Sequence, residues 1–270
     1  MKWPATAYRR ASSLDDVWQA FAAQGSGVQL LAGGQTLLAT LAFRLSEPAL
    51  LLDITGIPAL RGIALQGNTL RIGALTRHAE LGRDPLVAQH APLLHQAVPL
   101  IAHPAIRNRG TIGGSLAYAD PAAELPACAV ALGATLVLAS AKGERRVAAE
   151  AFFTGLFTTA LEPDELIVAV EVPIGQGGSI TEVARRSGDY AMCGLALVGA
   201  RPVFFGVGPG PVLARGAAAA LARGEVEAAC AALDTDLDPP ADLHGPPAMK
   251  RHLARVLLRR ATGTTTEIAA

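Results

Sequence analysis

Cysteine, aromatic residues and net charge are all scarce in this sequence. Its three cysteines, Cys128, Cys193 and Cys230, lie far apart and form no CxxC pair, which excludes a disulfide framework and the ligand spacing of an iron–sulfur cluster. Aromatic residues make up 4% of the chain, too few for a platform on which nucleic-acid bases stack. With 23 basic and 23 acidic residues the formal net charge is zero, so no general attraction to nucleic acid or anionic lipid is expected.

Signals for nucleophilic catalysis, metal binding and membrane insertion are also missing. The six histidines include no HExxH motif and no GxSxG motif occurs, so we predict neither a metal ligand nor a catalytic residue. The longest uncharged stretch, Leu125–Ala141, is interrupted by Pro126 and Gly133, and we interpret it as a buried helix followed by a strand rather than a membrane span. The first residues lack the apolar region of a secretion signal, which predicts a cytoplasmic protein.

Apolar residues are abundant and follow mixed patterns. They make up 51% of the 270 residues, enough for a sizeable core. Apolar strands over 28–31 and 50–53 flank a helical pattern over 36–45, which predicts a parallel strand–helix–strand unit. A hairpin over 61–74 and a helix over 86–98 follow. The order predicts an α+β protein in three parts, residues 1–58, 59–175 and 176–270.

A glycine pair follows the first of these strands, in Ala32-Gly33-Gly34-Gln35-Thr36-Leu37. Paired glycines let the backbone turn sharply and bring its N–H groups close to a ligand. The start of the next helix adds free N–H donors and a positive dipole end, which suit a phosphate or pyrophosphate. The alternative is an ordinary turn between a strand and a helix.

A second glycine pair lies in Thr111-Ile112-Gly113-Gly114-Ser115, behind Arg107 and Arg109. Its backbone and hydroxyl donors suit phosphate oxygens, although a hairpin turn beside a solvated basic stretch explains the same residues. Two such loops could grip one pyrophosphate from two sides. A third cluster, Gly206–Pro211, has Pro211 in place of the third glycine of the dinucleotide fingerprint, and we interpret it as a structural turn.

Two acidic residues and a basic helix complete the candidates. Asp120 and Glu124 are spaced by one helical turn. Helix capping explains both, but near the second loop either could accept hydrogen bonds from sugar hydroxyls. The helix predicted over 249–261 has a basic face, which we expect to be solvated, with contact to a partner protein as the minor alternative.

Nearly the whole chain resembles the FAD-binding medium subunit of the carbon monoxide dehydrogenase and xanthine dehydrogenase group of molybdenum hydroxylases. The similarity is strongest in AGGQTLLATLAFRL (32–45), RIGALTRHAEL (71–81), IRNRGTIGGSLAYADPAAELPA (106–127) and FFTGLFTTALEPDELIVAVEVP (152–173). It implies a two-part FAD-binding module of the vanillyl-alcohol-oxidase (PCMH) type, followed by a small α/β C-terminal subdomain. The chain departs from the family pattern at His103-Pro104 and in the segment 197–208.

The resemblance also implies which residues hold the cofactor. The two pyrophosphate loops of the family fall on Ala32–Thr36, with Leu37 beside them, and on Thr111–Ser115. The family's other flavin-contacting positions fall on Ile101, Asp120, Glu124, Ile167 and Tyr190.

The resemblance further implies a role in electron transfer. The chain would hold FAD noncovalently, take electrons from [2Fe–2S] clusters on a small subunit and pass them to an external acceptor. The substrate would be oxidised at a molybdenum cofactor on a large subunit. Two alternatives stay open: a self-sufficient FAD oxidoreductase of the same superfold, and a scaffold that has lost its flavin.

Overall fold

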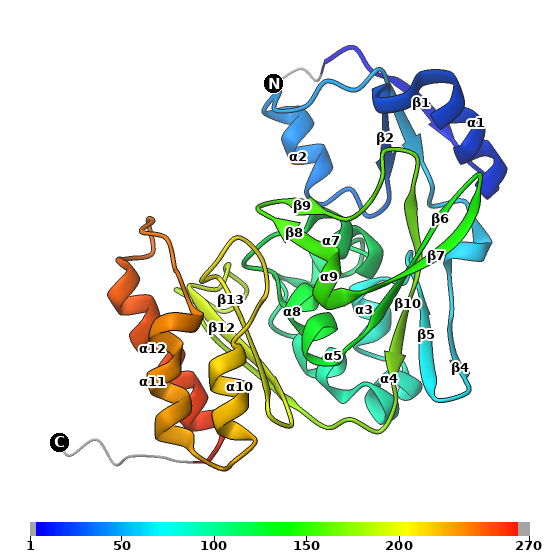
Figure 1. Ribbon diagram of the computed structural model, residues 1–270. Coiled ribbons are helices and arrows are strands. Elements are labelled where there is room, and N and C mark those ends of the chain that lie inside the picture. The colour runs from blue at the N-terminus through cyan, green and yellow to red at the C-terminus, as the bar shows by residue number, and fades with distance from the viewer. Residues whose placement is uncertain (1–3, 264–270) are drawn as a thin grey trace.

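The N-terminal lobe is built on a small parallel sheet, seen in the computed structural model, which describes residues 4–263 (Figure 1). Its elements are β1 (Ala7–Arg10), α1 (Leu14–Gln24), η1 (Gly25–Gly27), β2 (Val28–Leu31), α2 (Leu37–Ala42), β3 (Leu50–Asp53) and η2 (Pro58–Leu60). The strand order is β1-β3-β2. The predicted parallel unit is confirmed, since β2 and β3 pair in parallel with Val28 opposite Leu50. The sequence pattern does not predict β1, because all four of its residues are exposed.

The central part contains an antiparallel sheet in the order β4-β5-β10-β6-β7. Its strands are β4 (Ile63–Gln66), β5 (Thr69–Gly73), β6 (Thr135–Ser140), β7 (Gly143–Ala148) and β10 (Leu166–Pro173). The predicted hairpin is confirmed as β4 and β5, with Ile63 opposite Ile72. Strand β10 lies in the middle and is buried along most of its length, which explains its almost continuous apolar sequence. A small hairpin, β8 (Phe153–Gly155) and β9 (Thr158–Thr159), projects from this part.

Short helices cover the central sheet. They are α3 (His78–Leu81), α4 (Pro85–His90), α5 (Pro92–Ala97), α6 (Pro104–Arg107), α7 (Ile112–Tyr118), α8 (Glu124–Ala131) and α9 (Ala149–Phe152). The prediction of one helix over 86–98 is wrong. Ala91 leaves the helical conformation at φ −138° and ψ 56°, because the ring and missing N–H of Pro92 prevent the helix from continuing through it.

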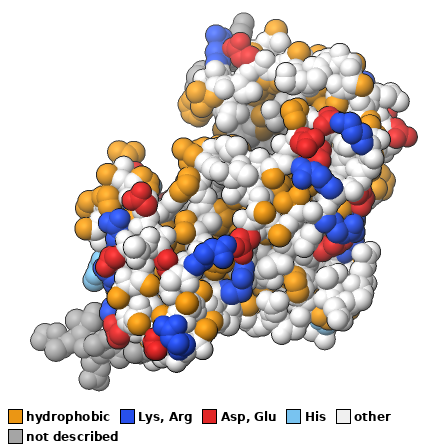
Figure 2. Space-filling model, in the orientation of Figure 1, with side chains coloured by type: hydrophobic (Ala, Val, Ile, Leu, Met, Phe, Trp, Pro, Cys, Tyr) orange, Lys and Arg blue, Asp and Glu red, His pale blue; other side chains and the backbone are white. Residues whose placement is uncertain are grey.

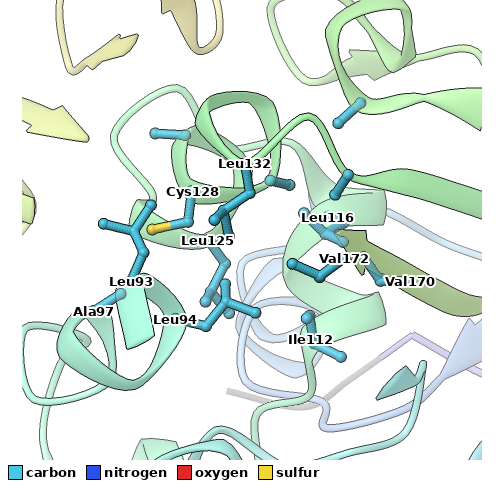
Figure 3. Close-up of a cluster of buried hydrophobic side chains, with 14 of the residues drawn as sticks. Leu93, Leu94, Ala97, Ile112, Leu116, Leu125, Cys128, Leu132, Val170 and Val172 are labelled. Atoms are coloured by element: carbon cyan, nitrogen blue, oxygen red, sulfur yellow. The ribbon is translucent and has the colours of Figure 1, made fainter. Parts of the chain in front are cut away.

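The main core lies where α5, α7 and α8 pack on β10. Figure 3 shows side chains from these elements meeting, among them Leu93, Leu116, Leu125 and Val170. Each of these four is at most 1% exposed. Burying a side chain of this size stabilises a fold by roughly 1.5–3 kcal/mol. The core thus fixes the start of α7 and α8 relative to the sheet.

The C-terminal part is an antiparallel sheet in the order β11-β12-β13-β14, with three helices on one side (Figure 1). Its elements are β11 (Ser179–Val183), β12 (Cys193–Val198), β13 (Arg201–Phe205), β14 (Val212–Leu213), α10 (Arg215–Leu221), α11 (Val226–Asp236) and α12 (Pro247–Ala261). Strands β12 and β13 lie against α8, so the sheet joins the central core on one face and its own helices on the other. The segment 197–208, which departs from the family pattern, forms the end of β12, all of β13 and the turns that flank β13.

The arginines of α12 do not form the solvated basic face expected from the sequence. Arg259 donates to Glu227 at 2.6 Å and Arg255 donates to Asp234, both on α11. Arg251 lies 3.6 Å from Asp238, just after α11. This face of α12 is therefore used within the chain, which leaves it less suited to a partner protein.

Three further findings concern membrane spans, metal sites and cysteines. Within residues 4–263, no helix combines the length and the apolar character needed to cross a membrane. In the same range, no three His, Cys, Asp or Glu side chains gather where a metal ion could be held. Cys128, Cys193 and Cys230 are buried free thiols.

Gly194 leads to a prediction about the C-terminal sheet. A Cβ on Gly194 would lie 2.0 Å from Cζ of Phe205, which is fully buried on the paired strand. Gly194→Ala should therefore lower the free energy of unfolding by about 1–3 kcal/mol through overpacking. Thermal unfolding would measure this, with Gly177→Ala as the matched control because a Cβ there meets no atom within 4 Å. Equal stability of the two variants would contradict the prediction.

Candidate functional site

A cavity of about 740 Å³ lies between the N-terminal lobe and the central part. Figure 2 shows a hollow on the left, between the upper lobe and the C-terminal part, with hydrophobic atoms along its edges. The volume falls in the range of small-molecule sites, about 300–1,000 Å³. The walls come from the loop between β2 and α2, the first turn of α7, the turn after α5, strand β10 and the loop before β12.

The residues predicted from the sequence converge on this cavity. All of them line it except Ile112. Those that do are Ala32, Gly33, Gly34, Gln35, Thr36, Leu37, Ile101, Thr111, Gly113, Gly114, Ser115, Asp120, Glu124, Ile167 and Tyr190. Ile112 instead points into the core, as Figure 3 shows, because the first turn of α7 presents one face to the cavity and the other to the sheet.

The first loop presents a row of backbone donors. Within residues 4–263, no N–H group from Gly33 to Leu37 donates a hydrogen bond to a protein acceptor. Gln35 Nε2 donates to the Gly33 carbonyl at 2.9 Å, which holds the turn closed from its side. Unpaired backbone donors next to a helix start form an anion-binding arrangement. The loop therefore suits the negative oxygens of a phosphate group.

The two glycines of this loop have different tasks. Gly34 has φ +71°, a left-handed conformation that costs a residue with a Cβ roughly 1–2 kcal/mol. Gly33 lies against the segment before the second loop: a Cβ on it would lie 2.4 Å from the Arg109 carbonyl oxygen and 2.8 Å from the Gly110 Cα. Gly34 thus shapes the turn, and Gly33 allows the two loops to touch.

The second loop differs from the sequence prediction. The prediction of backbone donors here is wrong for four of its five residues, because the N–H groups of Ile112, Gly113, Gly114 and Ser115 all donate within the protein. Thr111 is the N-cap of α7, and its hydroxyl oxygen accepts from the Gly114 N–H at 3.2 Å. A ligand can therefore use the hydroxyl groups of Thr111 and Ser115, and it can come close to the backbone at Gly113 and Gly114 because these residues have no side chain.

The turn that carries Ile101 is held by a single guanidinium group. Arg107 Nη1 donates to the carbonyls of Ile101 and Ala102, both at 2.9 Å. Ala102 itself has φ +42°, and a Cβ on Gly188 would lie 2.6 Å from the Ala102 carbonyl oxygen. His103-Pro104, the departure from the family pattern, provides the N-cap and first residue of α6, which places Arg107 for this contact.

The carboxyl group of Glu124 also lines the cavity. Glu124 begins α8 and is 8% exposed. Burial raises the pKa of Glu124 to about 8, and the neighbouring carboxyls of Glu182 and Asp120 add to this. Burial also raises the pKa of Glu182 to about 7. Glu124 is therefore mostly protonated near neutral pH and can donate a hydrogen bond as well as accept one.

The spacing of Asp120 and Glu124 indicates one shared helix, but in the structure only Glu124 lies on a helix. Asp120 lies in the turn between α7 and α8, where its Oδ1 accepts from the Ala122 N–H at 2.9 Å. Both carboxyls still face the same cavity. The turn, rather than a helical face, brings them together.

Hydrophobic and aromatic residues border the remaining wall. Ile167 lies on β10 at an irregularity in its pairing with β6, which turns this side chain toward the cavity. Tyr190 stands at the mouth and is 64% exposed. Nearby in the lining is Tyr118, whose ring lies 5.0 Å from that of Phe157.

His78 also lines the cavity and was not predicted from the sequence. It is 6% exposed, and neither ring nitrogen has a hydrogen-bond partner among the described residues. Its imidazole packs where Gly110 leaves room, since a Cβ there would lie 2.8 Å from His78 Cε1. Burial lowers the pKa of His78 to about 4, so the ring is neutral. Only its position inside RIGALTRHAEL, a segment similar to the family, signals it in the sequence.

Models of two protein families match the chain. The first, described as the FAD binding domain in molybdopterin dehydrogenase, matches residues 4–175. The second, described as the CO dehydrogenase flavoprotein C-terminal domain, matches residues 179–265. Together they account for nearly the whole sequence.

Individual proteins are similar over their full length. The chain is 38% identical to the alpha subunit of the 6-hydroxypseudooxynicotine dehydrogenase complex of Paenarthrobacter nicotinovorans, covering 96% of this chain and 94% of the relative. It is 35% identical to the carbon monoxide dehydrogenase medium chain of Afipia carboxidovorans, covering 94% of each. Among solved structures, a carbon monoxide dehydrogenase of Hydrogenophaga pseudoflava superposes with a TM-score of 0.93 at 36% identity, covering 98% of both chains.

Gly33→Ala should separate the two loops. The new Cβ would overlap backbone atoms of Arg109 and Gly110, which cannot move aside as a side chain can. We expect the affinity for flavin to fall by at least about tenfold, a change of roughly 1.4 kcal/mol in binding, and less flavin to remain on the purified chain. Gly27→Ala, in the same lobe but with its Cβ at an ordinary 3.4 Å from Ala49, is the control. Equal flavin content in both purified variants would show that the loop contact is dispensable.

Glu124→Gln should change how stability depends on pH. In the flavin-free fold Glu124 keeps a proton up to about pH 8, whereas its usual pKa is 4.5. The folded state thus binds more protons than the unfolded state in this window, so stability falls as pH rises through it. The Tm of Glu124→Gln relative to the unsubstituted chain should rise by a few degrees between pH 5 and pH 8. Glu144→Gln, at an exposed carboxyl of β7, should show a constant difference. A constant difference for Glu124→Gln as well would contradict the buried-acid assignment.

Proposed function

The chain belongs to the family of FAD-binding subunits of molybdopterin dehydrogenases, and from this we propose that it holds one FAD, without a covalent bond, in the cavity between its N-terminal lobe and central part. The observation that carries the proposal is the row of unpaired N–H groups from Gly33 to Leu37, set against the hydroxyls of the second loop in one cavity. When bound, FAD supplies the redox chemistry, by which electrons from a partner subunit reach an external acceptor.

The chain's own residues would bind and orient the cofactor. The first loop would hold the pyrophosphate through its backbone donors, and the hydroxyls of Thr36, Thr111 and Ser115 would add to them. Glu124, protonated near neutral pH, would donate to the cofactor, with Asp120 as an acceptor for sugar hydroxyls. The ring system would lie among the residues that border the far wall, Ile101, Ile167 and Tyr190.

The proposal extends to assembly. Two of the relatives above are named as a subunit of a dehydrogenase complex and as a medium chain. We propose that this chain works in the same way, with a large subunit that carries the molybdenum cofactor and a small subunit that carries [2Fe–2S] clusters. We also keep the division into residues 1–58, 59–175 and 176–270 as a proposal, which the three larger sheets, one in each part, support.

The two alternatives make different demands on the cavity. A flavin-free scaffold has no need for five open N–H groups beside a left-handed glycine, and filling them with protein acceptors would stabilise it. A self-sufficient oxidoreductase needs a substrate base next to the flavin. Glu124 does not supply this base near neutral pH, where it is mostly protonated, and substrate turnover by this chain alone is the test that separates the two possibilities.

The purified full chain should carry FAD and be unable to oxidise substrates alone. Acid precipitation should leave the flavin absorbance in the supernatant, because neither glycine loop contains His or Cys to form a covalent bond. Mixed with its molybdenum and iron–sulfur subunits, the chain should lose its oxidised flavin absorbance when the substrate of the complex is added.

Three outcomes would contradict parts of this proposal. Flavin that stays with the precipitated protein would overturn noncovalent binding, and His78→Asn would then show whether the cavity histidine is the attachment point. A chain that never carries flavin, even after FAD is added, would favour the scaffold. Turnover of aldehydes, purines or carbon monoxide by the chain alone would favour the self-sufficient enzyme.

A further inference from the structure

A second, smaller pocket adjoins the first loop and borders the large cavity. Its volume is about 250 Å³, and it shares Ala32, Gly33, Leu75 and Thr111 with the large cavity. Four arginines complete most of its wall, and we call it the arginine pocket: Arg10, Arg61, Arg77 and Arg109.

These arginines come from four separate places in the fold. Arg10 ends strand β1, Arg61 directly follows η2, Arg77 precedes α3, and Arg109 precedes the second loop. The carboxyl ends of the parallel strands β1 and β2 both point to this region, which is where ligands bind in open sheets of this kind. Sequence spacing does not predict the cluster, because folding alone brings the four together.

The four arginines of this pocket are exposed and have no carboxylate partner among the residues that line it. No Asp or Glu lines it, and none of its four arginines forms an ion pair within residues 4–263. Of the sixteen arginines outside the pocket, nine form ion pairs in the same range: Arg71, Arg145, Arg146, Arg201, Arg215, Arg223, Arg251, Arg255 and Arg259.

The nearby carboxylate of Asp53 has other partners. Its Oδ2 accepts from the Tyr8 hydroxyl at 2.8 Å, and its Oδ1 accepts from the Thr55 N–H and hydroxyl at 2.8 and 2.6 Å. Arg61 donates to the Thr55 carbonyl at 3.0 Å, which fixes one guanidinium at the pocket. The other three side chains of the pocket make no hydrogen bond to a described residue.

Four like charges around one small volume repel one another; solvent screens these exposed groups in part, and an anion between them would lower the remaining repulsion. Guanidinium groups match phosphate oxygens with paired hydrogen bonds and are weakly hydrated, so phosphate is the anion they bind best. The whole chain has a formal net charge of zero, so the four arginines are a local surplus of positive charge.

We propose that the arginine pocket is a binding site for a phosphate group, held by Arg10, Arg61, Arg77 and Arg109. The phosphate could be part of the dinucleotide in the neighbouring cavity or part of a separate small molecule. The anion chemistry rests on the guanidinium groups alone, and only the attribution to the dinucleotide rests on the proposed function.

Calorimetric titration with inorganic phosphate and pyrophosphate tests the site, at low salt, on the full chain with its flavin and after flavin removal. The variant Arg61→Gln with Arg77→Gln removes two of the four charges. We expect saturable binding by the unsubstituted chain, weakened by at least about tenfold in this variant. The matched control is Arg83→Gln with Arg186→Gln, which removes two exposed arginines that line neither pocket and should change the affinity less than twofold.

The outcomes separate the two sources. Binding by the flavin-free chain that added FAD displaces, with FAD itself held less tightly by Arg61→Gln with Arg77→Gln, assigns the site to the dinucleotide. Equal binding with and without flavin assigns it to a separate phosphate-bearing molecule. If neither form binds phosphate or pyrophosphate saturably, or if the two double variants bind equally well, the proposal is overturned. A chain that carries no flavin would contradict the proposed function and still leave this titration readable.

Discussion

The close contact between Gly33 and the Arg109–Gly110 backbone sets the geometry on which the rest of the site depends. It joins the parallel lobe to the central part at a point where no side chain fits. The large cavity lies on one side of this contact and the arginine pocket adjoins it, since both include Gly33 and Thr111. A residue larger than glycine would move the two walls of both pockets apart at once.

The two glycine loops look alike in sequence but divide the work. The first leaves its N–H groups open from Gly33 to Leu37. The N–H groups of the second loop donate hydrogen bonds to Ala74, Thr76 and Thr111, which anchors α7 to the central part. A rigid loop facing an open one is a suitable arrangement for binding an anion without reorganisation, because one wall holds its place while the other supplies donors.

Charge is distributed unevenly around this contact. The buried acid Glu124 and the half-buried acid Glu182 lie near or within the C-terminal part, where burial raises the pKa of each. The unpaired arginines lie toward the N-terminal lobe. A ligand with a phosphate-rich middle and a polar, neutral end matches this polarity, which agrees with the family to which the chain belongs.

The amino-acid pattern alone predicts the α+β class, the parallel unit, the hairpin and both glycine loops, because these depend on local apolar patterns and on conformations that glycine permits. Through its resemblance to a family it also identified the residues that now line one cavity. Which N–H groups of the two loops lack a protein acceptor depends on the tertiary structure. Ala74 and Thr76, which accept hydrogen bonds from the second loop, come from a strand end that is distant in the sequence. The pairing of α12 with α11, the burial of His78 without a hydrogen-bond partner in residues 4–263, and the gathering of four arginines from separate elements also depend on the tertiary structure, since long-range packing rather than spacing creates each arrangement.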